Sequence, residues 1–144
     1  MRLIVPDASI AAKWFLPRAN EPLVDEAFSL LQQYGHSQLD FIVPSVFWAE
    51  LGNVFWKAAR LGRWLPESAI AATRQIIDRD LRTIADGELL EDAIAIALTE
   101  RRTVYDSLYV ALATLYDAEM ITGDERLANS LAARFPVKWL GMVV

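Results

Sequence analysis

Short apolar segments alternate with longer helical patterns along the whole sequence, and this alternation constrains the fold more than any other feature. Strands are expected at residues 2–5, 39–43, 81–84, 119–122 and 137–140. Helices are expected at residues 8–16, 21–34, 44 to about 61, 66–80, 89–101, 106–116 and 125–134. Short buried strands separated by helices are typical of a parallel sheet covered on both faces. The pattern therefore predicts an α/β fold with a short, mainly parallel central sheet.

Prolines and glycines mark the ends of several expected helices. Pro17 stops the first helix, and Pro66 stands at the start of the fourth. Gly35 and Gly62 follow the second and third helices. The 144 residues contain no internal repeat, low-complexity tract or linker. We therefore expect residues 1–144 to form a single domain.

Composition excludes several classes of protein. With 54% hydrophobic and 23% charged residues, disorder is not expected. The absence of cysteine removes disulfides, thiolate metal ligands and cysteine nucleophiles. No apolar stretch approaches the roughly 20 residues of a membrane span, and the N-terminus does not resemble a signal peptide. We expect a cytoplasmic protein with no membrane partner. The net charge of −5 does not exclude RNA, because bound divalent cations would offset clustered acids.

Four acidic residues occupy positions that an α/β fold would bring together. Asp7 and Asp124 each follow an expected strand, Asp106 opens an apolar helical pattern, and Glu50 lies within the most aromatic expected helix. Ligands of parallel α/β folds bind beyond the carboxyl ends of the strands, where the strand order reverses. We therefore expect these four acids to converge on one crevice.

Three of these acids also have a structural interpretation. Asp7 and Asp124 are suitable N-caps for the helices that follow them, and Asp106 occupies the third position after Thr103 in a capping-box pattern. Glu50 differs, because it lies mid-helix beside apolar neighbours, where no helix end requires it. Its structural alternative is an ion pair or a solvated helix edge.

A cluster of four carboxylates requires positive charge. Two like charges about 4 Å apart repel by roughly 4 kcal/mol at an effective dielectric constant of 20. Mg²⁺ and Mn²⁺ suit such an all-oxygen site, whereas a zinc site rich in histidine is excluded because His36 is the only histidine. The acids thus predict a divalent-metal site.

The segments that carry the acids form an ordered set of motifs. They are VPDAS at residues 5–9, VPS at 43–45 leading to EL at 50–51, YDSLYVALA at 105–113 and TGDERL at 122–127. Together they resemble the PIN-domain ribonucleases, and most of all the VapC toxins of toxin–antitoxin pairs. The resemblance implies a three-layer α/β/α sandwich and endonucleolytic RNA cleavage that depends on Mg²⁺, with Mn²⁺ as a substitute. It also implies a cognate antitoxin and a homodimer.

The resemblance also implies roles for individual residues. The catalytic and metal-binding acids would be Asp7, Glu50, Asp106 and Asp124, holding one or two ions. Ser9 and Thr122 match small hydroxyl residues that orient such carboxylates. Apart from the resemblance, Lys57 is a candidate to hold substrate phosphate, along with Lys13 and Arg126, and the alternative for each is an ordinary solvated charge.

The aromatic helix allows two interpretations. The residues are Phe47, Trp48, Phe55, Trp56 and Trp64. Some of these rings could form a homodimer contact or an antitoxin groove, or they could fill a thick core with a few rings left exposed.

Two rival functions follow from the same fold. A phosphoaspartate receiver or a haloacid-dehalogenase-like hydrolase is disfavoured, because neither places its acids at this spacing. A non-catalytic PIN-like module that binds RNA or protein, with acids that only cap helices, stays open.

Overall fold

Residues 1–143, which the computed structural model describes, contain five strands, seven α-helices and one 3-10 helix. The strands are β1 (Arg2–Pro6), β2 (Leu39–Pro44), β3 (Arg82–Ile84), β4 (Glu119–Thr122) and β5 (Val137–Trp139). The α-helices are α1 (Ala8–Lys13), α2 (Val24–Gly35), α3 (Val46–Arg60), α4 (Pro66–Asp78), α5 (Asp86–Glu100), α6 (Val104–Leu115) and α7 (Glu125–Leu131), and η1 is Leu140–Met142. The predicted α/β class is confirmed.

The five strands form one parallel sheet in the order β3-β2-β1-β4-β5. The chain moves outward from β1 to β2 and β3, and then returns to the other side of β1 to add β4 and β5. The strand order therefore reverses between β1 and β4. Their registered pairs, such as Val5 with Met120, bring the ends of these two strands to the same edge of the sheet.

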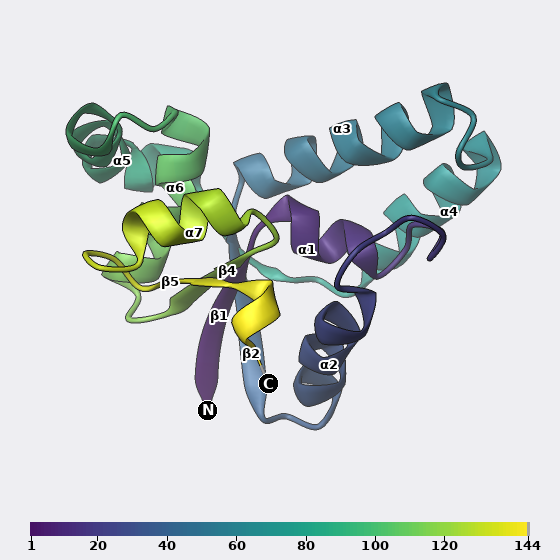
Figure 1. The fold of residues 1–144 in the computed structure, drawn as a ribbon, viewed down its shortest axis with the longest axis horizontal. Helices are drawn as coiled ribbons and strands as arrows, with labels where there is room; N and C mark the ends of the chain where they lie inside the picture. The colour runs from purple at the N-terminus through teal and green to yellow at the C-terminus, as the bar shows by residue number, and fades with distance from the viewer. Residues whose placement is uncertain (144) are drawn as a thin grey trace.

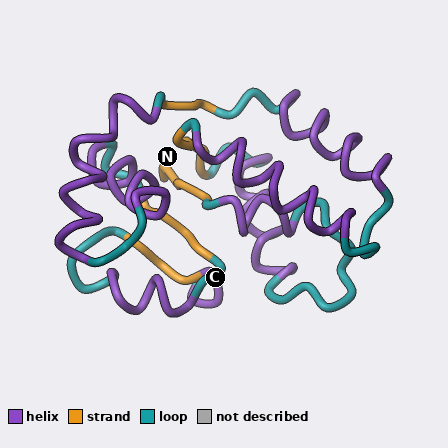
Figure 2. Tube along the Cα trace, turned by 90° about the horizontal axis from the view of Figure 1, so that it is seen from above, coloured by secondary structure: helices purple, strands orange, loops and turns teal. Residues whose placement is uncertain are grey.

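Helices cover both faces of the sheet (Figure 1). α5, α6 and α7 lie on one side, whereas α1, α2, α3 and α4 lie on the other, as the view from above also shows (Figure 2). This division follows from right-handed crossovers that run first in one direction along the sheet and then in the other. α3 and α4 lie side by side and extend away from the sheet (Figure 1). The predicted three-layer α/β/α arrangement is thus the observed one.

The core lies between the sheet and its helices. Ile4, Val5 and Ile42 have no exposed surface, as expected for strands covered on both faces. Residues 107–113 of α6 are all buried, because this helix packs against the sheet on one side and α5 on the other. The apolar helical pattern that Asp106 opens in the sequence is therefore the buried central helix of its layer.

Several helix ends differ from the sequence-based expectation. α2 begins at Val24 rather than at residue 21, because Leu23 adopts a left-handed backbone conformation (φ 57°) that is incompatible with an α-helix. α1 ends at Lys13, and residues 14–16 form turns. α6 begins at Val104, where the Thr103 hydroxyl accepts a hydrogen bond from the Asp106 backbone N–H at 3.1 Å.

The rings of α3 and of the turn after it match the interpretation of a thick core with a few rings left exposed. Phe47 and Phe55 are buried, and Trp48 and Trp64 pack partly buried against the core. Trp56 is 57% exposed and lies on the face of α3 away from the core.

No helix within residues 1–143 is both long enough and apolar enough to cross a membrane.

Candidate active site

A pocket of about 630 Å³ opens where the strand order reverses. Its walls include residues that follow β1 and β4 and residues of α3 and α6. The four acids predicted from the sequence all line it, namely Asp7, Glu50, Asp106 and Asp124. The sheet topology thus brings together carboxylates that lie up to 117 positions apart in the sequence (124 − 7 = 117).

Asp7 lies at the centre of the hydrogen bonds between β1 and β4. Its backbone N–H donates to the Ile121 carbonyl at 3.1 Å, which continues the strand pairing to the end of β1. Its carboxylate caps α1 by accepting the backbone N–H groups of Ser9 at 3.0 Å and Ile10 at 3.3 Å. The helix-capping interpretation is therefore correct for Asp7, and it coexists with a position in the pocket wall.

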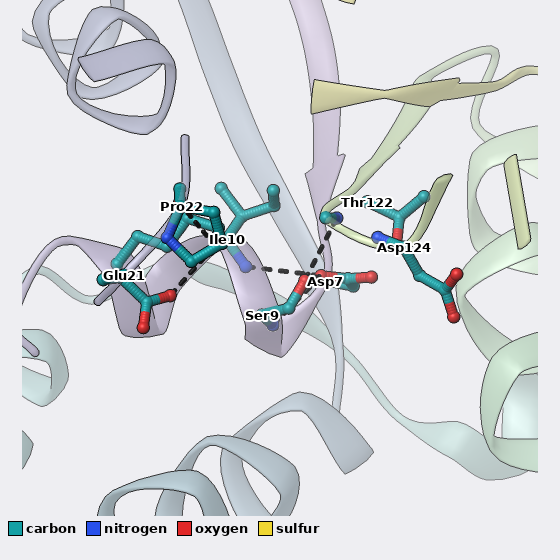
Figure 3. Close-up of polar contacts among 9 residues, drawn as sticks. Asp7, Ser9, Ile10, Glu21, Pro22, Thr122 and Asp124 are labelled. Atoms are coloured by element: carbon teal, nitrogen blue, oxygen red, sulfur yellow. Dashed lines mark hydrogen bonds and ion pairs between the residues drawn. The ribbon is translucent and has the colours of Figure 1, made fainter. Parts of the chain in front are cut away.

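Two hydroxyl residues hold this junction together (Figure 3). The Ser9 hydroxyl donates to the Asp7 carboxylate and accepts the Gly123 backbone N–H at 3.1 Å. Thr122 is fully buried, and its hydroxyl accepts the Asp124 backbone N–H at 3.0 Å. A Cβ at Gly123 would lie 3.0 Å from the Ser9 hydroxyl, so a side chain there would press on the group that orients Asp7. These hydrogen bonds place both hydroxyl groups beside the segments that carry Asp7 and Asp124.

Glu50 reaches the pocket from α3 and is held by a buried tyrosine. The Tyr109 hydroxyl donates to Glu50 Oε1 at 2.6 Å. Tyr109 belongs to α6, so this hydrogen bond joins helices from opposite layers of the fold. Burial raises the pKa of Tyr109 well above its usual range, and the neighbouring Glu50 carboxylate raises it further. Tyr109 therefore stays a proton donor to Glu50.

Asp106 lines the pocket from α6, and Asp124 lines it from the start of α7. The Asp124 carboxylate caps α7 by accepting the Leu127 backbone N–H at 3.1 Å. Asp106, in contrast, caps no helix with its carboxylate, because its hydrogen bond to Thr103 uses the backbone N–H. The side chain of Asp106 is thus left facing the pocket, where Arg102 is its nearby positive charge.

Three of the four carboxylates are difficult to ionise. Burial is the largest cause that raises the pKa of Asp7, of Glu50 and of Asp106 above their ordinary values. The charges of Asp7 and Asp106 raise the pKa of Glu50 further, and Asp124 has the same effect on Asp106. Hydrogen bonds from Ser9 and Thr122 partly offset the rise at Asp7. The carboxylates therefore act on one another, and positive charge in the pocket would stabilise all of them.

These pKa shifts predict how one variant changes stability with pH. Because the folded pKa of Asp106 is raised, the folded state binds its proton more tightly than the unfolded chain does. The free energy of unfolding therefore falls as pH rises from the unfolded pKa through the raised folded pKa. In metal-free protein, Asp106→Asn is expected to raise Tm by roughly 1–4 °C at pH 7.5. This gain should shrink as pH falls toward 4 and disappear below the unfolded pKa, where Asp106 is protonated in both states.

Thermal melts of wild type and Asp106→Asn in a chelator, between pH 4 and 8, measure this difference. Asp92→Asn is the matched control, since Asp92 is exposed on α5 outside the pocket. A constant difference across the pH range, or a loss of stability at pH 7.5, would contradict the expectation.

The donor set suits a hard divalent cation, but the side chains do not form a ready coordination shell. Within residues 1–143, no three histidine, aspartate or glutamate side chains stand close enough together to hold a metal ion. The carboxylates of Asp7 and Asp124 accept hydrogen bonds from the helix ends that they cap, and the Glu50 carboxylate accepts one from Tyr109. Carboxylate oxygens are nevertheless the ligands that Mg²⁺ and Mn²⁺ prefer, so the residues present fit such an ion after side-chain rotation.

The three basic residues expected at the site have different surroundings. Lys13 is only 5% exposed, and its ammonium pairs with Glu21 at 2.9 Å and donates to the Pro22 carbonyl at 2.9 Å. This pair ties α1 to the loop before α2 and occupies the ammonium. Lys57 and Arg126 are exposed and lie outside the pocket lining.

Sequence reasoning assigned no role to Tyr109 or Arg102. The spacing gave one usable signal, because Tyr109 follows Asp106 by three positions and so lies on the same face of a helix. Nothing in the sequence indicates that Tyr109 meets Glu50, 59 positions away.

The profile of the PIN domain family matches residues 4–130. The chain belongs to the PIN-domain family. This PIN domain is 33% identical over 135 residues to Ribonuclease VapC3 of Pyrobaculum aerophilum, covering 92% of this chain and 97% of that protein. The resemblance inferred from the four motifs is confirmed.

Solved structures share the fold of this PIN domain. The crystal structure of PAE2754 from Pyrobaculum aerophilum superposes with a TM-score of 0.69 at 20% identity, covering 97% of this chain and 85% of that one. A toxin–antitoxin complex from Klebsiella pneumoniae contains a chain with a TM-score of 0.63 at 18% identity, with 96% of both chains covered. At these identities the likeness concerns the fold.

Proposed function

We propose that this PIN domain is a divalent-metal-dependent endoribonuclease, the toxin of a VapBC-type toxin–antitoxin module. One observation carries the proposal, namely that carboxylates from four separate segments line one pocket at the reversal of strand order, with the pKa raised in three of them. A cluster of acids, three of them partly buried, is costly without a cation. The relationship to a protein named as a ribonuclease supports RNA as the substrate.

The residues of the pocket would have two kinds of role, namely binding the metal ions and orienting the carboxylates that bind them. Asp7, Glu50, Asp106 and Asp124 would hold one or two Mg²⁺ or Mn²⁺ ions. When bound, such ions neutralise the scissile phosphate and lower the pKa of an attacking water. Ser9 keeps the Asp7 carboxylate in place through its bridge to the Gly123 N–H, and Thr122 does the same for the start of the segment that carries Asp124.

Substrate binding would rest on exposed cations near the pocket. Lys57 lies two helical turns beyond Glu50 on α3, and Arg126 lies in the first turn of α7 after Asp124. Both are free to meet RNA phosphates, whereas the ammonium of Lys13 is already paired with Glu21. We therefore retain Lys57 and Arg126 as phosphate contacts and propose that Lys13 supports the site by anchoring α1.

Partners would bind the extended pair α3 and α4. Trp56, Leu65, Ile70 and Ile77 of this region are each more than half exposed. Apolar side chains gathered on a surface are typical of protein-binding sites. This surface supports a cognate antitoxin and a second copy of the chain as partners. Because cellular RNA is the proposed substrate, we propose that the protein acts in the cytoplasm.

Removal of metal is expected to stop cleavage. The residues that line the pocket include no lysine or arginine to neutralise the scissile phosphate. Removal of the divalent ion with EDTA should therefore lower the RNA cleavage rate by at least about 100-fold. Mg²⁺ or Mn²⁺ in excess over EDTA should restore the rate. The measurement is cleavage of a fluorescently labelled RNA by purified protein freed of antitoxin.

The same assay separates this function from a non-catalytic module. The helix caps made by Asp7 and Asp124, and the lack of a ready coordination shell in residues 1–143, are the observations that favour structural acids. Cleavage that is equal with and without EDTA would refute the metal nuclease. RNA binding with no cleavage under any metal condition would establish the binding module instead.

A further inference from the structure

The hydrogen bond between Tyr109 and Glu50 has a geometry that packing alone does not require. Tyr109 is 2% exposed on α6, and its hydroxyl donates to Glu50 Oε1 at 2.6 Å across the pocket that both residues line. A phenylalanine would fill the same space against the core. The hydroxyl group therefore serves polar contacts, with the Glu50 carboxylate as its side-chain partner and the Ala8 backbone N–H as a second, weaker one.

Glu50 needs such a partner to keep one orientation. It lies in the middle of α3, where no helix end fixes its carboxylate, and its side chain has three rotatable bonds. Among the described residues, Tyr109 is the one hydrogen-bond donor that reaches this carboxylate. A short hydrogen bond to a charged acceptor is among the stronger ones in proteins. Asp7, by comparison, is held by Ser9 and by the helix end that it caps.

We propose that Tyr109 is the positioning residue for Glu50, engaging Oε1 so that Oε2 is the oxygen offered to a divalent cation in the pocket. This inference rests on the proposed function and deepens it. Groups that orient a ligand are expected to affect metal binding through that ligand, without touching the metal or the RNA. Tyr109 thereby couples the α6 layer to the acid contributed by α3.

A purely structural role predicts a different result. If the Tyr109 hydroxyl only needed a buried acceptor, its loss would change the free energy of unfolding and leave metal affinity unchanged. The two roles are therefore separated by Mn²⁺ affinity measured without RNA. They are also separated by whether the effect depends on the Glu50 carboxylate.

The test is a double-mutant cycle of Tyr109→Phe and Glu50→Gln, read by electron paramagnetic resonance of Mn²⁺ bound to the antitoxin-free protein. Tyr109→Phe is expected to raise the Mn²⁺ Kd by about 10-fold or more. It should lower kcat for RNA cleavage by a similar factor with KM for RNA unchanged. In the Glu50→Gln background, Tyr109→Phe should change the Mn²⁺ Kd by less than about twofold. Circular dichroism verifies that each variant is folded.

Tyr116→Phe is the matched control, because Tyr116 follows the same helix and lies outside the pocket lining. It should leave both Mn²⁺ affinity and kcat at the wild-type values. The inference is overturned if wild type binds Mn²⁺ and cleaves RNA while Tyr109→Phe does both equally well, or if the two substitutions have independent, multiplying effects. A wild type that neither binds Mn²⁺ nor cleaves RNA overturns the proposed function, and this inference with it.

Discussion

Asp7→Asn is expected to lower the rate of RNA cleavage by at least about 10²–10³-fold, the range for losing one preorganised electrostatic group in an active site. Asp7 is the acid most enclosed by the fold, at the end of β1 and beside the first turn of α1. Asparagine occupies the same volume but carries no negative charge for a cation. The loss should appear in kcat, since Asp7 would act through the metal rather than by binding distant parts of the RNA.

The protein should stay folded when Asp7 is replaced. Asparagine is as good an N-cap as aspartate, so α1 keeps a side-chain acceptor for its first N–H groups. Removal of a buried charge whose pKa is raised also relieves a desolvation cost. Circular dichroism and thermal melting should therefore show little change while the cleavage assay shows a large one.

Asp117→Asn is the matched control for this experiment. Asp117 is exposed in the turn before β4, at the sheet edge opposite the pocket, and its left-handed backbone (φ 51°) suits asparagine. It should cleave RNA at the wild-type rate. Full activity in Asp7→Asn would remove Asp7 from the catalytic site and favour the interpretation in which it only caps a helix.

Phe41→Ala is expected to have the largest effect on stability, about 3–5 kcal/mol of the free energy of unfolding. Phe41 is 1% exposed in β2. Its ring stacks on Tyr34 of α2 with centroids 4.8 Å apart and meets Trp14 at 5.3 Å. Truncation would leave a cavity where the sheet, the end of α1 and α2 come together. It would also remove aromatic contacts that add to simple burial.

Urea unfolding followed by tryptophan fluorescence measures this loss. Phe28→Ala is the matched control, because Phe28 is 37% exposed and its ring contacts the Arg18 guanidinium at 5.8 Å. It should cost less than about 1 kcal/mol. Since a domain of this kind is stable by about 5–15 kcal/mol, Phe41→Ala should approach unfolding at 37 °C. A loss below 1 kcal/mol would mean that the aromatic cluster does not support the core.

The alternation of strands and helices was sufficient to predict the fold, because a buried parallel strand and a helix that covers it have different apolar periods. Strand β4 was predicted at its observed residues, and β1 and β2 within one residue. The prediction of helix ends was less accurate. The start of α2 depends on the left-handed conformation of Leu23, which apolar periodicity does not report.

The candidate site, like the fold, was predicted in part from the sequence. The sequence by itself determined which acids share a sheet edge, since in a parallel sheet a residue's place along the chain fixes which end of its strand it follows. Asp7, Glu50, Asp106 and Asp124 therefore line one pocket as expected. Whether they act as a metal site stays a proposal.

Only the tertiary structure decided which side chains meet across that pocket. It buried Lys13 against Glu21 and placed the Tyr109 hydroxyl on Glu50. Neither pairing follows from periodicity, because each depends on how far two separate helices or loops approach one another. The sequence thus specified the elements, the edge of the sheet where the acids gather and the local helix caps made by Asp7 and Asp124. The hydrogen bond that orients Glu50 arose instead from packing between layers that are distant in the chain.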